Sequence, residues 1–306
     1  MLELMIHLSM DLEKTKTFLL EILKMNAEPK SLDWLALQKE KIGEDTSYMK
    51  FYLAFGMASR YFKKNLMDLS ETKIQKAKTL VEGFSPESWD QLQTARSYLL
   101  LHFGIADASA WVDAINKLFE TADMHEQQSL YAALPLMPFR EEMVERAVEG
   151  LRTNIASVFD AIALDNPYPS QYMEERAWNQ MVLKAVFMQR PLYRIQGADK
   201  RANPTLAKIL VDFAHERWAA GRKVMPELWR FVGPYLDIQN FGDIEKVIHS
   251  SDPLEKNAAL LACHQSGFVP ANSLLKQFPK VQREIQQGEL TWEKIGREFE
   301  NLSRPQ

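Results

Sequence analysis

Residues 165–223 read DNPYPSQYMEERAWNQMVLKAVFMQRPLYRIQGADKRANPTLAKILVDFAHERWAAGRK, and the rest of the chain repeats their pattern of helices between stiff turns. The turns contain Asn-Pro, Pro-Tyr-Pro and Arg-Pro, which restrict the backbone where it is not helical. Apolar spacing predicts helices over residues 178–188 and 204–218, the second capped by Asn203 and started by Pro204. No strand pattern occurs in the sequence. It therefore predicts an all-α protein.

Charge is concentrated in the same stretch. Residues 190–223 hold eight Lys or Arg against three Asp or Glu, a local charge of +5 in a chain whose formal net charge is −4. A cationic segment attracts anions, whereas an acidic chain disfavours nucleic-acid binding. We therefore expect an anionic small molecule or a partner protein, and no nucleic acid.

The composition indicates a folded chain inside the cell. With 306 residues, 46% of them hydrophobic, it can bury a large core. No apolar run approaches the ~20 residues that span a bilayer. The first residues lack the basic and apolar regions of a secretory signal, so we expect a cytoplasmic protein. The single cysteine, Cys263, excludes an internal disulfide and fits a buried position.

A helix–turn–helix pattern recurs along the chain. INKLFETADMHEQQSLYAAL (115–134) aligns with IEKVIHSSDPLEKNAALLAC (244–263), which pairs Asp123 with Asp252 in the turn. A third copy with a longer turn covers residues 159–185 and places Asp165 in the turn. Stacked helix pairs of this kind predict an irregular HEAT-like α-solenoid, and an irregular all-α domain is the alternative. We expect one elongated domain over residues 1–306, with a subdivision near 138–165 as the alternative.

Motifs of the common enzyme classes are absent: the chain has no glycine-rich phosphate loop, no GxSxG and no HExxH. Asp212, His215 and Glu216 lie one turn apart on the predicted 204–218 helix and could hold a cation or transfer protons. They lie off the apolar stripe, which favours a solvated face or a structural link from His215. We expect no metal and no cofactor.

Five segments resemble the EboA-domain family of bacterial proteins: DNPYP (165–169), AWNQMVLKA (177–185), GADKRAN (197–203), DFAHERWAAGR (212–222) and LWRFVGPY (228–235). The resemblance implies a cytoplasmic helical protein without an assigned catalytic mechanism. It also implies a gene cluster that makes or exports a secondary metabolite, and association with a membrane protein of that pathway. No family active site can be carried over.

Three functional hypotheses follow. The first is a non-enzymatic binding or scaffold protein that presents a basic helical surface, including the turn from Arg194 to Arg201, to an anionic metabolite or pathway protein. The second is an enzyme acting on a phosphorylated or prenylated small molecule, with Lys184, Asp212 and His215 transferring protons. The third makes the basic residues a salt-bridge network. The candidate ligand-binding residues are Tyr168, Trp178, Asn179, Lys184, Arg194, Asp199, Arg201, Asp212, His215 and Arg217.

Lys184 carries a sharper prediction. Around the 176–188 helix, Asn179, Gln180 and Lys184 share a sector with Leu183 and Phe187, so no side is cleanly polar. This pattern predicts a helix that runs through the interior, with Lys184 buried, paired to a carboxylate and lining a pocket. Asp165, Asp199 and Asp212 are the candidate carboxylates.

Overall fold

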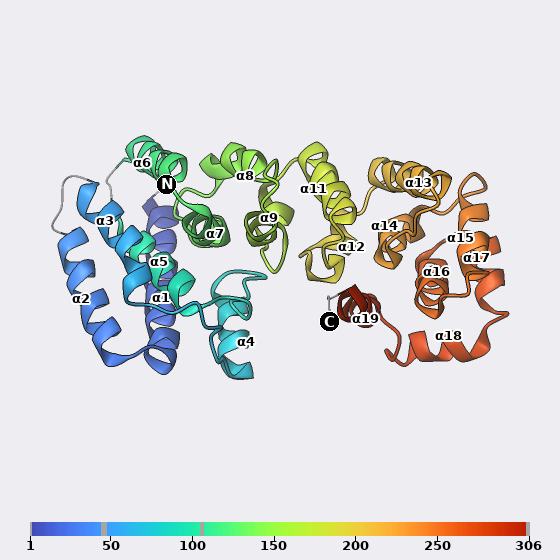
Figure 1. The fold of residues 1–306 in the computed structure, drawn as a ribbon, viewed down its shortest axis with the longest axis horizontal. Coiled ribbons are helices and arrows are strands. Elements are labelled where there is room, and N and C mark those ends of the chain that lie inside the picture. Colours follow the sequence, from blue (N-terminus) through green and yellow to red (C-terminus); the bar gives the residue numbers. More distant parts are fainter. Residues whose placement is uncertain (1, 44–47, 105–106, 304–306) are drawn as a thin grey trace. The chain divides into compact units, whose positions relative to one another are not determined.

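The structure, a computed structural model, describes residues 2–43, 48–104 and 107–303, with residues 2–11 and 303 described by their backbone alone. The described residues form 19 α-helices and six short 3-10 helices, with no strand among them (Figure 1). The prediction of an all-α protein is therefore confirmed. Residues 1–173 and residues 174–306 form two compact units. Within the described ranges, no helix is both long enough and apolar enough to span a membrane.

The first unit contains ten α-helices, within the residues described. They are α1 (Leu2–Asn26), α2 (Pro29–Gly43), α3 (Met49–Met57), α4 (Glu71–Leu80), α5 (Gln91–His102), α6 (Ala108–Thr121), α7 (Met124–Ala132), α8 (Val144–Gly150), α9 (Ala156–Ala163) and α10 (Tyr168–Tyr172), with 3-10 helices η1 (Ala58–Arg60), η2 (Leu134–Leu136) and η3 (Glu141–Met143). The centre of the unit is α5, whose residues 92–101 are all buried against α1, α2, α3 and α7.

The start of α5 does not follow the local sequence signal. Ser85-Pro86 is a strong local signal for a helix start, but the helix begins at Gln91, and the carboxylate of Asp90 accepts the N–H of Gln93 at 2.6 Å. The hydroxyl of Ser85 instead donates to the carboxylate of Glu87. An isolated bridge pairs Asp90 with Leu66, and Pro86 begins a turn in which its carbonyl accepts the N–H of Trp89 at 3.0 Å. A contact distant in sequence thus overrides the local signal.

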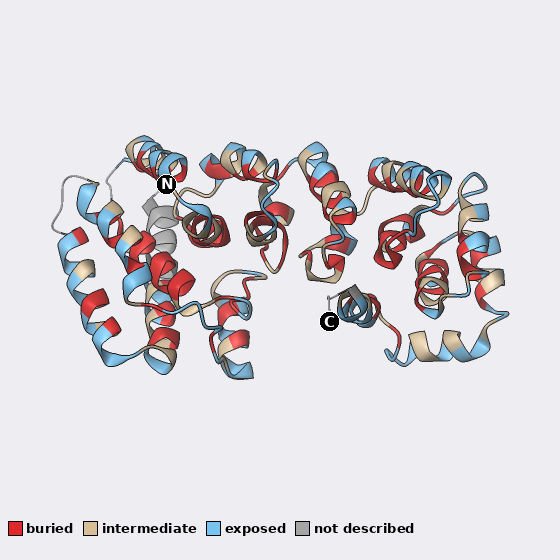
Figure 2. Ribbon diagram, in the orientation of Figure 1, coloured by how far each residue is buried: buried red, intermediate tan, exposed pale blue. Residues whose placement is uncertain are grey.

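The second unit contains α11 (Glu175–Phe187), α12 (Ala198–Arg201), α13 (Pro204–Ala219), α14 (Trp229–Val232), α15 (Phe241–Ile248), α16 (Pro253–Gln265), α17 (Val269–Leu275), α18 (Pro279–Gln286) and α19 (Trp292–Ser303), with 3-10 helices η4 (Leu192–Arg194), η5 (Pro226–Leu228) and η6 (Gly233–Tyr235). Its core surrounds α16, which packs against α14, α15, α17, α18 and α19. Figure 2 shows α14 and α16 mostly buried.

Small residues let α16 approach its neighbours closely. A Cβ on Gly233 would lie 2.9 Å from the Cα and the carbonyl oxygen of Ala262, so only glycine fits there. Cys263, next in the chain, is fully buried, as predicted, and burial raises the pKa of its thiol to about 12. The alanine-rich run is therefore a close-packing surface.

The two helix pairs that align in sequence have the same kind of cap at the start of their second helix. The carboxylate of Asp123 caps α7 through the N–H groups of His125 and Glu126, and that of Asp252 caps α16 through the N–H of Leu254. In the third copy, Asp165 lies in the turn after α9, as predicted, with a left-handed backbone and a φ of 52°. The turn also contains α10, which lies between the two helices that the alignment pairs.

Candidate functional site

The candidate site is a surface pocket in the second unit, lined by one face of α11 and the last turns of α13. From α11 come Gln180, Leu183, Lys184 and Phe187, and from α13 and its end come Phe213, Glu216, Arg217 and Arg222. These sets follow the i, i+3, i+4 spacing of one helix face. The pocket has a volume of about 510 Å³. Two of the predicted site residues, Lys184 and Arg217, lie in it.

The end of α13 brings Arg222 to the pocket. Gly221 adopts a left-handed backbone with φ of +69°. Its N–H donates to the carbonyl of Trp218, and the N–H of Arg222 donates to that of Arg217, at 2.9 Å each. This is a Schellman motif, which turns the chain back along the last turn of the helix. Arg222 therefore lines the same pocket as Arg217.

Charge in the pocket is predominantly positive: Lys184, Arg217 and Arg222 face one acidic residue, Glu216. Nε of Arg217 donates to the carbonyl of Lys223 at 3.1 Å, which fixes the guanidinium and leaves its two Nη groups for another acceptor. Arg222 is exposed to solvent. Lys184 is half-buried, and the resulting desolvation lowers its pKa. A guanidinium fork matches the paired oxygens of a carboxylate or phosphate.

The predicted burial of Lys184 is wrong. Lys184 and Leu183 are half-buried, and Gln180 and Phe187 are exposed, Phe187 to 71%. The opposite faces of α11 are buried, as the helical wheel predicts. Apart from the buried Asn179, the mixed polar and apolar sector is thus a pocket wall and not a buried surface. The prediction that Lys184 lines a pocket is confirmed.

Asn179 and Trp178 of α11 have structural partners. The amides of Asn179 and Asn203 exchange two hydrogen bonds, and the oxygen of Asn203 also accepts the N–H of Leu206 to cap α13. The guanidinium carbon of Arg201 lies 5.0 Å from the centre of the buried Trp178 ring. Desolvation lowers the pKa of Arg201. These contacts join the first turns of the two pocket helices.

Asp199 and Arg194 lie outside the pocket lining. The carboxylate of Asp199 on α12 accepts two hydrogen bonds from Arg230, from Nε and Nη2, both at 2.7 Å. Arg194 is half-buried in η4. The basic run between residues 190 and 223 therefore supplies separate contacts, of which Arg217 and Arg222 enter the pocket.

His215 makes a link to α15, as one of the two sequence interpretations expects. Its Nε2 lies 2.8 Å from Oδ1 of Asp243. The ammonium of Lys246 lies 3.7 Å from the centre of the Trp218 ring on the next turn. Asp212 is exposed and does not line the pocket. Within the described ranges, no group of His, Cys, Asp and Glu side chains could hold a metal ion.

A buried carboxyl lies elsewhere in the second unit. Glu227 is fully buried in η5, where its Oε2 accepts the N–H of Leu192 at 3.2 Å. Its Oε1 has no hydrogen-bond partner among the described residues. Burial raises the pKa of Glu227 to about 8, so the carboxyl is mostly protonated at neutral pH. Helix α19 packs over it, and Gly296 leaves the space that it occupies.

Tyr168 is the one predicted site residue in the first unit. It is fully buried, its hydroxyl donates to the carbonyl of Arg140 at 2.5 Å, and burial raises its pKa. A pocket of about 420 Å³ lies nearby, lined by Arg140, Gln171 and Glu82 among others. Arg140 and Gln171 donate to backbone carbonyls of the unit itself. This pocket therefore has fewer hydrogen-bond donors for an anion than the pocket between α11 and α13.

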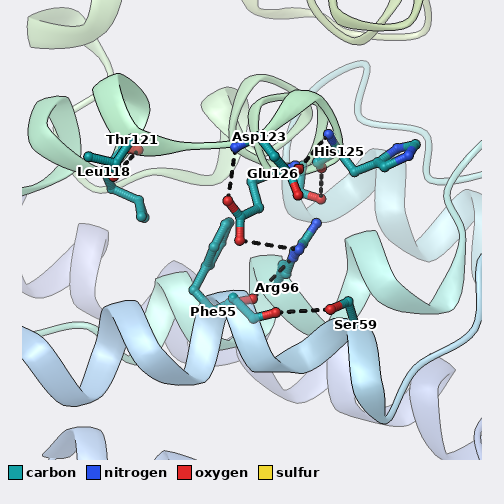
Figure 3. A network of polar contacts seen from close by, with 10 residues as sticks. Phe55, Ser59, Arg96, Leu118, Thr121, Asp123, His125 and Glu126 are labelled. Carbon is teal, nitrogen blue, oxygen red and sulfur yellow. Dashed lines mark hydrogen bonds and ion pairs between the residues drawn. The ribbon is translucent and has the colours of Figure 1, made fainter.

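The first unit also contains a buried cation, Arg96 (Figure 3). It is 1% exposed, with Nε donating to the carbonyl of Phe55 at 3.2 Å and Nη2 lying 3.5 Å from Oε1 of Glu126. The guanidinium also lies over the Phe55 ring. Glu126 completes the capping box of α7 with Asp123. Arg96 thus joins α5 to α3 and α7, and its position is structural.

Sequence reasoning named Glu216 only as part of the trio with Asp212 and His215. It left five other pocket residues out of its candidates: Gln180, Leu183, Phe187, Phe213 and Arg222. A signal was present, because 180, 183, 184 and 187 form one helix face that mixes polar and apolar side chains, and so do 213, 216 and 217. Such a face on two helices in succession is typical of a shared groove.

Comparison with known proteins gives one family. The model of the family described as metabolite traffic protein EboA matches residues 15–233, which include every residue that lines the pocket. None of the curated proteins and none of the solved structures compared with the chain matches it.

Proposed function

We propose a function from the premise that this chain belongs to the family of the metabolite traffic protein EboA. The chain is a non-enzymatic binding protein that holds an anionic small molecule in the pocket between α11 and α13. The observation that carries the proposal is the meeting of Arg217, Arg222 and Lys184 in one surface pocket. Metabolite traffic requires reversible binding, and an open, cationic pocket supports it.

The enzymatic alternative has less support. It needs Lys184, Asp212 and His215 around one reacting group, within hydrogen-bonding reach. Of the three, Lys184 lines the pocket, while Nε2 of His215 is bonded to Asp243. The binding hypothesis requires only the cations that already line the pocket, Lys184, Arg217 and Arg222.

Handover to a partner belongs to the same proposal. Gln180, Phe187, Glu216 and Arg222 are exposed, so a ligand in the pocket stays accessible from outside. The chain passes its ligand in the cytoplasm to a pathway protein, a membrane protein included. A HEAT-like repeat is the arrangement that we propose for the helices, supported by the matching caps Asp123 and Asp252.

Anion-dependent stabilisation tests the binding function. We expect phosphate, pyrophosphate or sugar phosphates to raise the melting temperature, because a ligand that binds the folded state stabilises it. Arg222→Gln should abolish the shift because it removes a cation from the pocket lining. Arg222 is exposed, so the variant should still fold. Arg283→Gln, an exposed arginine on α18, is the matched control and should respond like the parent. An equal response in all three proteins would place the anion elsewhere.

A further inference from the structure

We propose that the ligand of the α11–α13 pocket is a low-molecular-mass amphiphile, with an oxyanion head and a hydrocarbon tail. This inference rests on the proposed function, because it takes this pocket as the binding site. It goes further by naming the class of ligand. Its basis is that the lining combines three cations with three large apolar side chains, Leu183, Phe187 and Phe213.

The two kinds of side chain are one helical turn apart. On α13, Phe213 precedes Arg217 by four residues, and on α11, Lys184 precedes Phe187 by three. Residues four apart have Cβ atoms about 5–6 Å from each other on one face. A molecule whose head meets Arg217 therefore has apolar surface within reach one turn away. An inorganic anion would leave that surface in water.

Phe187 gives the strongest reason for a tail. It is 71% exposed at the end of α11, whereas Phe213 and Leu183 are half-buried. Covering a phenyl ring with hydrocarbon is favourable in proportion to the apolar area removed from water. A tail lying along Leu183 and Phe213 would cover Phe187, and the arginines would fix the head.

A detached molecule fits this pocket better than a membrane surface does. A helix that lies on a bilayer presents a continuous apolar face to it. The apolar face of α11, which includes Trp178, Met181, Val182 and Ala185, is buried in the protein. Two of the three apolar pocket residues are recessed, so the pocket offers one projecting ring and a cationic rim.

The test is a homologous series of anions measured by titration calorimetry at fixed ionic strength: inorganic phosphate, then butyl, hexyl and octyl phosphate below its micelle concentration. We expect affinity to rise about two- to fourfold per methylene until the tail fills the pocket. Phe187→Ser should weaken octyl phosphate binding about tenfold and leave inorganic phosphate unchanged. Ile238→Ser removes an 81% exposed residue outside the pocket lining and should change neither.

The outcomes separate this inference from the proposed function. Equal affinity across the series, with Phe187→Ser inert, would overturn the amphiphile and leave anion binding standing. Binding that is absent, or that survives Arg217→Gln combined with Arg222→Gln, would overturn both. Binding to phosphatidylglycerol vesicles without binding of monomeric octyl phosphate would replace the small molecule by a membrane.

Discussion

The side-chain amides of Asn179 and Asn203 donate to each other, Asn179 Nδ2 to Asn203 Oδ1 at 3.2 Å and Asn203 Nδ2 to Asn179 Oδ1 at 2.8 Å. The same Asn203 oxygen caps α13. Because Asn179 belongs to α11, one reciprocal pair fixes the start of the second pocket helix against the first. The spacing of the pocket therefore depends on an amide contact outside its lining.

Asn203→Ala should lower the free energy of unfolding by about 2–4 kcal/mol. The loss combines a helix cap, about 1 kcal/mol, with a buried Asn179 amide deprived of its partner, about 1–3 kcal/mol. Urea unfolding followed by tryptophan fluorescence measures it. Asp107→Ala removes the cap of α6 without such a tie and should cost about 1 kcal/mol. Equal losses in the two variants would contradict the coupling.

Glu227 should make stability depend on pH in one direction. Its pKa is about 8 in the folded chain, against the ordinary value of 4.5 for a glutamate. Between these values the unfolded chain releases the proton that the folded chain keeps, so stability falls as pH rises from about 4.5 to about 8. Over that range the free energy of unfolding of Glu227→Gln should rise relative to that of the parent by about 4 kcal/mol. Urea unfolding of both proteins at pH 5 and pH 8 measures the change. A constant difference between the two proteins would show that Glu227 is ionised throughout.

Substitutions at Gln189 and Gly221 should change stability in opposite directions. Each follows a pocket helix with a left-handed backbone, φ of 54° at Gln189 and +69° at Gly221. The conformation costs a residue with a Cβ about 1–2 kcal/mol, and glycine loses about 0.5–1 kcal/mol more in backbone entropy. Gln189→Gly should therefore raise the free energy of unfolding by up to about 1 kcal/mol, and Gly221→Ala should lower it by about 1 kcal/mol. Thermal unfolding measures both, and a loss in Gln189→Gly would refute the strain.

Glu126→Ala should destabilise the first unit by about 3 kcal/mol, because it leaves the buried Arg96 guanidinium without its carboxylate. The matched control is Glu149→Ala, whose partner Arg146 is bonded to it at the surface and whose loss should cost under about 1 kcal/mol. Urea unfolding of both variants decides. A cost under 1 kcal/mol for each would mean that Arg96 gains nothing from Glu126.

The helices were predictable where local signals determine them. Asn203 caps α13 as the sequence predicts, because the cap involves only the next three residues. The start of α5 was not, since the bridge of Asp90 to Leu66 joins residues far apart in sequence.

The site was predictable only in part, for a related reason. The charge pattern identified Arg217 and the helical wheel identified Lys184, but a wheel shows which residues share a face and not what that face meets. Phe213 and Arg217 come opposite Leu183 and Lys184 through the packing of α11 on α13. The same limit explains the mistaken burial of Lys184.

Native mass spectrometry of the protein purified from its own host tests the central claim most directly, that the α11–α13 pocket holds an anionic small molecule. The parent and the Arg217→Gln/Arg222→Gln double variant are purified side by side, with Arg283→Gln as the control. We predict a small anionic molecule bound to the parent and the control and absent from the double variant. A ligand retained by the double variant, or a parent that carries only a protein partner, would contradict the claim.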